Sequence, residues 1–200
     1  MRRKFLVFET PFQSGGNTAY SMEKRVIKHE RGKNFQGIIK YLEDKSGMDI
    51  HEQGIVTINA SSYIANMKNV IDYKHDDDWQ SKNIQNSWWE INFRKIKVQI
   101  NGYSIKTHSA SSMSGNHLKN WVIEGKNEGE EWEEIDRQDN NDLKGPLYEH
   151  YYSLKEMTKP YQYIRIKIIG KDHYYYSHNK DYYFLYFNQF EIFGEINEEA

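Results

Sequence analysis

The chain has 200 residues, a mass of 24.0 kDa and a formal net charge of -2 at pH 7. This length suits one sizeable domain with its own hydrophobic core, and the weak net charge excludes the broad basic field expected of a nucleic-acid-binding protein. Because the sequence contains no Cys, disulfides and thiolate metal sites are excluded, and a reducing compartment is favoured. Aromatic residues make up 15% of the chain, which favours β structure.

Residues 1–34 carry few periodic signals and are predicted to form an N-terminal arm with short strands over residues 5–8 and 26–29. The apolar run of residues 5–8 ends at Glu9, so it is shorter than the roughly 7–15 apolar residues of a secretory signal. No stretch reaches the ~20 apolar residues of a membrane span. We therefore expect a cytoplasmic protein whose arm docks its apolar residues on a larger assembly.

A short helix is predicted over residues 35–45, because its apolar residues share one helical face and Gly47 is placed to end it. The strand that follows is predicted over residues 54–62. It is apolar on much of both faces, so we expect it at the centre of a sheet.

The clearest alternating pattern predicts a strand over residues 89–100. Trp89, Ile91 and Phe93 alternate there with polar residues, so the three large apolar side chains are expected on one buried face. The Asn-Gly pair at residues 101–102 lies between two alternating runs and predicts a hairpin turn.

Further strands are expected in the second half of the chain, the last of them broken near Asn188: residues 103–107, 118–124, 132–136, 147–154, 163–169 and 183–193. Short strands separated by turn residues indicate an all-β, antiparallel sandwich. We predict one such domain over residues 35–196, followed by a tail of residues 197–200.

Several pieces of the sequence, in order and spacing over about residues 54–194, resemble the coagulation factor 5/8 type C, or discoidin, family. They are residues 58–62, 79–82, 89–93, 103–106, 117–125, 132, 163–166 and 190–194. Residues 35–42 are similar to a lead-in of intracellular versions of this domain. The resemblance implies a jelly-roll β-sandwich of the galactose-binding-like fold. The cysteines that bracket secreted members are absent here, which argues against an extracellular location.

The resemblance also implies a non-catalytic binding module that uses the loops at one end of the sandwich. Family members recognise glycans, phospholipid head groups or proteins there, and the corresponding loops are residues 63–72, 74–82 and 108–117. The candidate contact residues are Tyr63, Ile64, Met67, Asp76, Asp78, Trp79, Met113, His117, His173, Tyr174 and Tyr175.

Two clusters have both a functional and a structural interpretation. A calcium site is one interpretation of Asp76, Asp77 and Asp78, since hard cations prefer carboxylate oxygens. However, adjacent side chains in one loop rarely converge on one ion. A solvated acidic loop is therefore favoured, and no cofactor is expected. The tyrosines of residues 174–176 offer a platform for sugars or a partner, but alternate tyrosines at a strand end also serve as core and rim.

Three functions remain open. The leading hypothesis is a protein-interaction module within a larger intracellular assembly, for which a cytoskeletal or ciliary host is one candidate. The alternative is a glycan-binding, lectin-like domain. A hydrolase is the remote third, because the sequence has no nucleophile elbow, phosphate loop or His-Glu metal motif. Nucleic acid is not expected as a partner, and membrane binding is disfavoured because the loops lack a basic surround.

Overall fold

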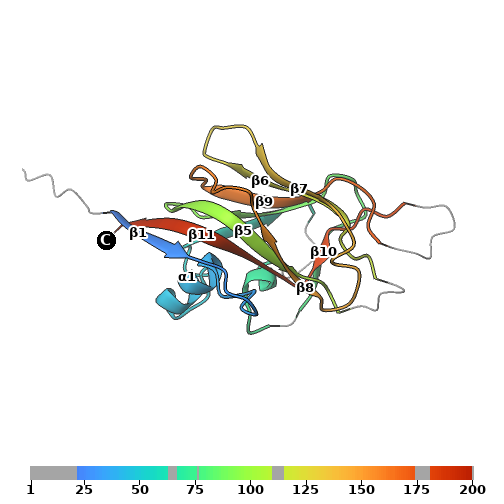
Figure 1. Ribbon diagram of the computed structural model, residues 1–200, viewed down its shortest axis with the longest axis horizontal. Coiled ribbons are helices and arrows are strands. Elements are labelled where there is room, and N and C mark those ends of the chain that lie inside the picture. Colours follow the sequence, from blue (N-terminus) through green and yellow to red (C-terminus); the bar gives the residue numbers. More distant parts are fainter. Residues whose placement is uncertain (1–21, 63–66, 76, 110–114, 174–180, 200) are drawn as a thin grey trace, which may run out of the picture.

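The computed structural model describes residues 22–62, 67–75, 77–109, 115–173 and 181–199. Its strands form antiparallel sheets that pack as a two-layered sandwich, which confirms the predicted jelly-roll fold class (Figure 1). The four-stranded sheet has the order β1 (Met22–Ile27), β11 (Gln189–Glu199), β5 (Lys97–Lys106), β8 (Glu149–Ser153). The five-stranded sheet has the order β2 (Thr57–Ala60), β4 (Trp88–Asn92), β9 (Tyr163–Ile168), β6 (Asn120–Lys126), β7 (Glu133–Asp139). A two-stranded sheet pairs β3 (Trp79–Gln80) with β10 (Tyr186–Phe187).

The core lies between the two large sheets and depends on the alternating strand that the sequence predicts. Trp89, Ile91 and Phe93 are all fully buried, as expected. The indole Nε1 of Trp89 donates to the carbonyl of Met67 at 2.9 Å, so the buried polar atom of this large side chain is satisfied.

Helix α1 (Ile38–Ser46) packs against β11, and a 3₁₀ turn, η1 (Asn69–Ile71), lies on the same strand (Figure 1). The helix ends as predicted, because Gly47 takes a left-handed φ of 69° and donates its N–H to the carbonyl of Glu43 at 2.9 Å. The apolar face predicted for it, Ile38, Ile39 and Leu42, is buried in the core.

The predicted hairpin turn at residues 101–102 is wrong. The chain reverses at Arg94–Lys95, and β5 runs continuously through Asn101 and Gly102. The register between β5 and β11 shifts there, since Phe193 faces Gly102 while Gly194 faces Ile100. The Asn-Gly pair therefore marks a β-bulge, in which Asn101 is the extra residue.

The strand predicted over residues 54–62 is shorter than expected and lies at a sheet edge, so its predicted central position is wrong. Only Thr57–Ala60 forms β2. Ile55 and Val56, whose apolar side chains favoured a central strand, belong to the preceding turn, where Val56 is buried and its N–H reaches the carbonyl of Ile50 at 3.2 Å.

Part of the predicted arm belongs to the four-stranded sheet. Strand β1 pairs with β11 from Met22 opposite Glu199 to Ile27 opposite Gly194, and β11 runs into the predicted tail. Residues 1–21 lie outside the described part of the chain. The domain boundary at residue 35 stays a prediction that truncation can test.

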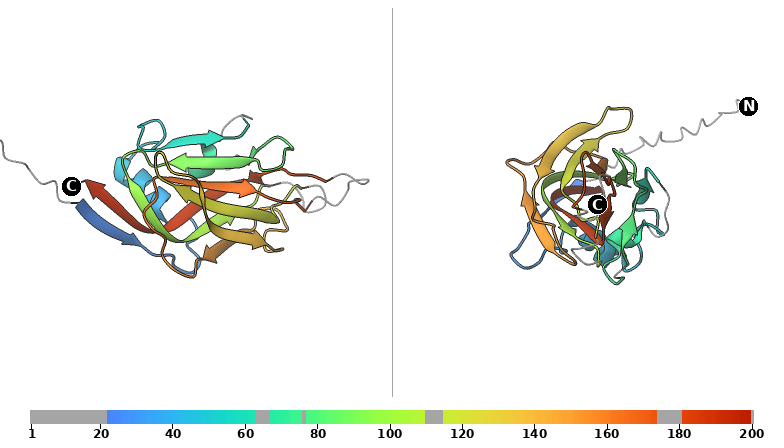
Figure 2. Two further views of the ribbon diagram at one scale, coloured as in Figure 1. Left: turned by 90° about the horizontal axis from the view of Figure 1, so that it is seen from above. Right: turned by 90° about the vertical axis from the view of Figure 1, so that its right-hand side faces the viewer.

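The two ends of the sandwich are formed by different connections between the strands (Figure 2). The loop end consists of the connections β2–β3, β3–β4, β5–β6, β7–β8 and β9–β10. The basal end consists of α1, the β4–β5 turn, the β6–β7 turn and the β8–β9 connection, beside the start of β1 and the end of β11 (Figure 1). None of the described helices is both long and apolar enough to cross a membrane.

Candidate binding sites at the two ends of the sandwich

The sequence places its candidate contact residues at the loop end, and about half of them lie outside the described residues. These are Tyr63, Ile64, Asp76, Met113, Tyr174 and Tyr175. The remaining candidates are described, and the structure gives most of them internal roles.

Trp79 is a core residue, which corrects the prediction that it contacts a ligand. Its side chain is 1% exposed and packs edge-on against Phe187, with ring centroids 5.7 Å apart. An indole with both faces covered offers nothing for a sugar to stack on. Met67 is half-buried and packs against the same core.

Asp78 fastens two segments of the loop end together. Its carboxylate accepts from the N–H and O–H of Ser109, at 3.0 and 2.7 Å, and from Nδ2 of Asn188 at 3.0 Å. Asp77 accepts from Nδ2 of Asn69 at 3.0 Å. Within the described residues, no group of three His, Cys, Asp or Glu side chains could hold a metal ion.

His117 takes part in a column of three stacked rings. The ring of His108 lies 4.1 Å from that of His117 on one side and 3.6 Å from that of Tyr186 on the other, nearly parallel to both. Burial, followed by the neighbouring His117, lowers the pKa of His108 to about 3, so this imidazole is neutral at physiological pH. The N–H of His173 donates to the carbonyl of His117 at 2.9 Å, and burial also lowers the pKa of the His173 ring.

The loop end carries a row of aromatic rings that the sequence did not reveal as a site. Tyr182, Phe184 and Tyr186 are half-buried, as is Tyr183, whereas Leu185 and Phe187 are fully buried, so the alternation begins at Phe184. The rings of Tyr182 and Phe184 stack at 6.1 Å, with 16° between their planes. We call Tyr182, Phe184 and Tyr186 the aromatic ladder. Its alternation was hidden because residues 182–187 are aromatic or apolar at every position.

Polar side chains flank the aromatic ladder on the neighbouring segment. Gln80 pairs with Tyr186 across β3 and β10, so the two side chains share one face. Ser81 binds Leu185 through two hydrogen bonds, of 2.9 and 3.0 Å, and the next residue along, Lys82, is exposed. Further along, Asn83 accepts the N–H of Tyr183 at 2.7 Å. The ladder is therefore held rigidly beside an amide and an ammonium group.

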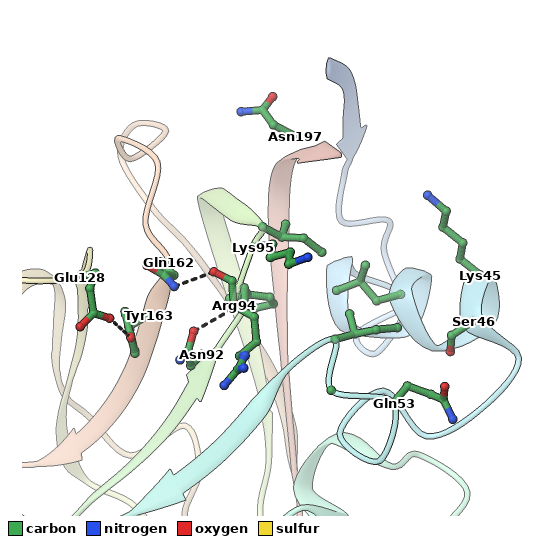
Figure 3. Close-up of a pocket in the computed structure, with 15 residues that line it drawn as sticks. Lys45, Ser46, Gln53, Asn92, Arg94, Lys95, Glu128, Gln162, Tyr163 and Asn197 are labelled. Carbon is green, nitrogen blue, oxygen red and sulfur yellow. Dashed lines mark hydrogen bonds between the residues drawn. The ribbon is translucent and has the colours of Figure 1, made fainter. Parts of the chain in front are cut away.

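The basal end contains an open cleft with a volume of about 840 Å³ (Figure 3). Its lining comes from α1, the segment before β2, the β4–β5 turn, the β6–β7 turn, the start of β9 and the end of β11. The polar and charged residues are Lys45, Ser46, Gln53, Asn92, Arg94, Lys95, Glu128, Gln162, Tyr163 and Asn197. No residue of this cleft could be predicted as a contact residue from the sequence, since the lining is scattered over six segments.

The turn that carries Arg94 is fixed in the cleft by two side chains. Arg94 has a φ of 58°, in the left-handed region, and its N–H donates to Oδ1 of Asn92 at 2.7 Å. Its carbonyl accepts from Nε2 of Gln162 at 2.6 Å. Across the cleft, the hydroxyl of Tyr163 donates to the carboxylate of Glu128 (Figure 3).

Comparison with known proteins places this chain among sandwich domains of one type. The family model of the F5/8 type C domain matches residues 57–181. No curated protein matches the sequence.

Among solved structures, a family 32 CBM from C. perfringens NanJ, solved with galactose, is 13% identical with a TM-score of 0.51, covering 73% of this chain and 96% of its own. A module of Clostridium perfringens CpGH89, solved with GalNAc-β-1,3-galactose, is also 13% identical, with a TM-score of 0.52. The match covers 70% of this chain and 96% of that module. A fucolectin from the serum of striped bass (Morone saxatilis) is 14% identical, with a TM-score of 0.53. The match covers 70% of this chain and 47% of the fucolectin chain. At these identities the likeness shows the shared fold.

Proposed function

Because the chain belongs to the F5/8 type C domain family, we propose that it is a non-catalytic glycan-binding module that holds sugar at its loop end. The observation that carries this proposal is the aromatic ladder. A pyranose ring has an apolar C–H face and hydroxyl edges, so it requires a flat apolar surface beside polar groups that fix its orientation. The ladder, with Gln80 and Lys82 next to it, provides both kinds of surface.

The charges of the loop end also suit a neutral ligand. Asp78 is satisfied by three protein donors, and the lowered pKa of His108 keeps this imidazole uncharged. Asp78 therefore has its acceptor atoms occupied and His108 adds no charge, while the exposed ammonium of Lys82 can donate to a sugar hydroxyl. Structural neighbours solved with galactose and with GalNAc-β-1,3-galactose support a saccharide as the ligand class.

The same geometry supports binding without catalysis. A general acid or base must come within hydrogen-bond reach of the substrate. His108 and His117 are fully buried within the stacked column, and Asp78 is directed at Ser109 and Asn188. In the described part of the loop end, these groups hold the structure together.

A glycan array followed by titration of the best neutral sugar tests the proposal. Phe184→Ala removes one ring of the ladder and is expected to weaken binding about tenfold, or about 1.4 kcal/mol, because the lost aromatic surface no longer covers the sugar face. Tyr148→Ala is the matched control, since Tyr148 is a 50% exposed aromatic residue on the β7–β8 connection of the same end. A blank array, or equal losses in both variants, would refute a sugar site on the ladder.

Protein interaction in a cytoplasmic assembly stays a prediction with one supporting observation. Strand β1 is an edge of the four-stranded sheet, and Val26 on it is 47% exposed, so this edge could add a strand from a partner. Affinity purification tests this second function, and recovery of no stoichiometric partner would count against it. Fractionation of the source cells tests the cytoplasmic location.

A further inference from the structure

We propose that the basal cleft is a second, independent binding site, which takes the carboxylate of an acidic saccharide such as a hexuronate. The cleft (Figure 3) lies at the basal end of the sandwich, whereas the aromatic ladder lies at the loop end. Its volume of about 840 Å³ falls within the range of roughly 300–1,000 Å³ that is usual for small-molecule sites.

The charge of the cleft is opposite to that of the chain as a whole. Two cationic side chains of the β4–β5 turn, Arg94 and Lys95, line it against the single carboxylate of Glu128. These three groups sum to a formal charge of +1 in a protein whose formal net charge is -2. Within the described residues, no carboxylate forms an ion pair with Arg94 or Lys95. A concave site with excess positive charge favours an anionic ligand.

The backbone of Arg94 supports a functional role for this turn. A left-handed φ is uncommon for a residue with a side chain and costs of order 1–3 kcal/mol, and such strain concentrates where a ligand is held. Here Asn92 and Gln162 stabilise the strained conformation by binding the N–H and the carbonyl of Arg94. Glycine would adopt the same turn without strain, so an arginine at this position carries an energetic cost.

The walls of the cleft distinguish a saccharide from a bare inorganic anion. Leu42, Ile55 and Ile96 give it an apolar side, while Asn92 and Gln162 line it with amide groups. Apolar C–H faces, hydroxyl edges and one negative charge occur together in a uronic acid. A sulfate or phosphate ion would make no use of the apolar side. Arg94 supplies the planar, bidentate donor that suits a carboxylate.

Calorimetric titration with trigalacturonate tests the proposal, with galactotriose as the neutral probe of equal length and sulfate as the bare anion. The double variant Arg94→Gly with Lys95→Gln removes both cations and relieves the strained φ, so it is expected to fold. Its affinity for trigalacturonate is expected to fall about tenfold, because two exposed charged contacts with the carboxylates are lost. Lys155→Gln is the matched control, because Lys155 is an exposed cation at the basal end outside the cleft.

The proposal would be overturned if trigalacturonate did not bind, or if an equal concentration of sulfate displaced it. It would also be overturned if Lys155→Gln lost as much affinity for trigalacturonate as the double variant, or if Phe184→Ala lost this affinity and the double variant kept it. The last result would assign the acidic sugar to the aromatic ladder. A glycan array without any bound neutral sugar, with trigalacturonate binding intact and sensitive to the double variant, would refute the loop-end function and leave the basal site standing.

Discussion

Glu191 joins the helix to the sheet through a single buried carboxylate. Its side chain is fully buried, and its two oxygens accept from the N–H groups of Gly37, Ile39 and Lys40 at 2.9, 2.9 and 3.0 Å. Its own neighbour Ile192 donates a fourth bond at 2.8 Å. Gly37, the N-cap of α1, has no side chain of its own to bind these N–H groups. A residue of β11 therefore caps the helix from more than 150 positions away.

This carboxylate gives a testable pH dependence. Burial raises the pKa of Glu191 from 4.5 to about 7, against the lowering effect of its backbone N–H partners. The folded state then holds a proton more tightly than the unfolded state between these values, so Glu191 lowers the free energy of unfolding as pH rises from 4.5 to about 7. Glu191→Gln is expected to lack this decline. Below pH 4.5 it is expected to be less stable than wild type by about 1–3 kcal/mol, because its amide faces two N–H donors, and this difference narrows as pH rises to about 7.

Denaturant unfolding at several pH values measures the effect, read as the difference between wild type and variant. The difference is needed because His108, whose pKa is lowered, contributes a dependence of opposite sign below pH 6.5. Glu131→Gln, which changes an exposed carboxylate in the β6–β7 turn, is the control. Identical pH slopes for wild type and Glu191→Gln would contradict the prediction.

Among the elements, β11 depends on a glycine at its bulge. Gly194 has a φ of 145°, and a Cβ added there would lie 2.0 Å from the carbonyl oxygen of Gln99 and 2.9 Å from Cα of Ile100. Both contacts are with backbone, which cannot move aside without breaking the pairing of β5 with β11. Gly194→Ala is expected to destabilise the fold by roughly 2–4 kcal/mol.

Thermal unfolding checks this, with an expected fall in Tm of roughly 4–16 °C for a domain of this size. Gly32→Ala is a suitable control: its φ is 79°, but nothing lies within 4 Å of the added Cβ, so only the backbone strain of about 1 kcal/mol is expected. If both substitutions cost the same, the contact at the bulge is not what requires glycine.

The elements also show how far the sequence predicts this fold. Trp89, Ile91 and Phe93 could be assigned to the core because burial on one face leaves a period of two in the sequence. The bulge could not be distinguished from a turn, because Asn-Gly suits both and the choice depends on Gly194, almost a hundred residues away. The aromatic ladder was missed for a similar reason: the inner and outer residues of that segment are equally apolar, so only the packed structure separates them.

At the scale of the whole molecule, the two ends of the sandwich have different electrostatic characters. Around Asp78 and His108, the loop end uses its titratable groups to hold segments together. At the basal end, the cations of Arg94 and Lys95 face an open cleft without a paired carboxylate among the described residues. This separation would allow the two proposed ligands, one neutral and one acidic, to bind at once. The sequence could not predict this arrangement, since each end is assembled from distant segments.

The boundary of the folding unit is also decided at this scale. The sheet pairing that the structure describes begins at Met22, and the residues after β1 continue to pack on the sandwich. His29 stacks on Tyr151 at 3.7 Å and meets Phe193 edge-on at 5.1 Å. Removal of residues 1–34 takes away β1 and this ring contact, whereas removal of residues 1–21 keeps both.

The longer truncation leaves β11 as an unpaired edge, so we expect a lower Tm together with association of the exposed edges. Differential scanning calorimetry combined with light scattering measures both effects, and the shorter truncation serves as the control. If the chain that begins at residue 35 were monomeric and as stable as the full chain, β1 would be an appendage, and the domain boundary predicted from the sequence would stand. Aggregation of the chain that begins at residue 35 would instead place the domain boundary at the start of β1. In that case β1 covers an edge of β11 that would otherwise associate with other molecules.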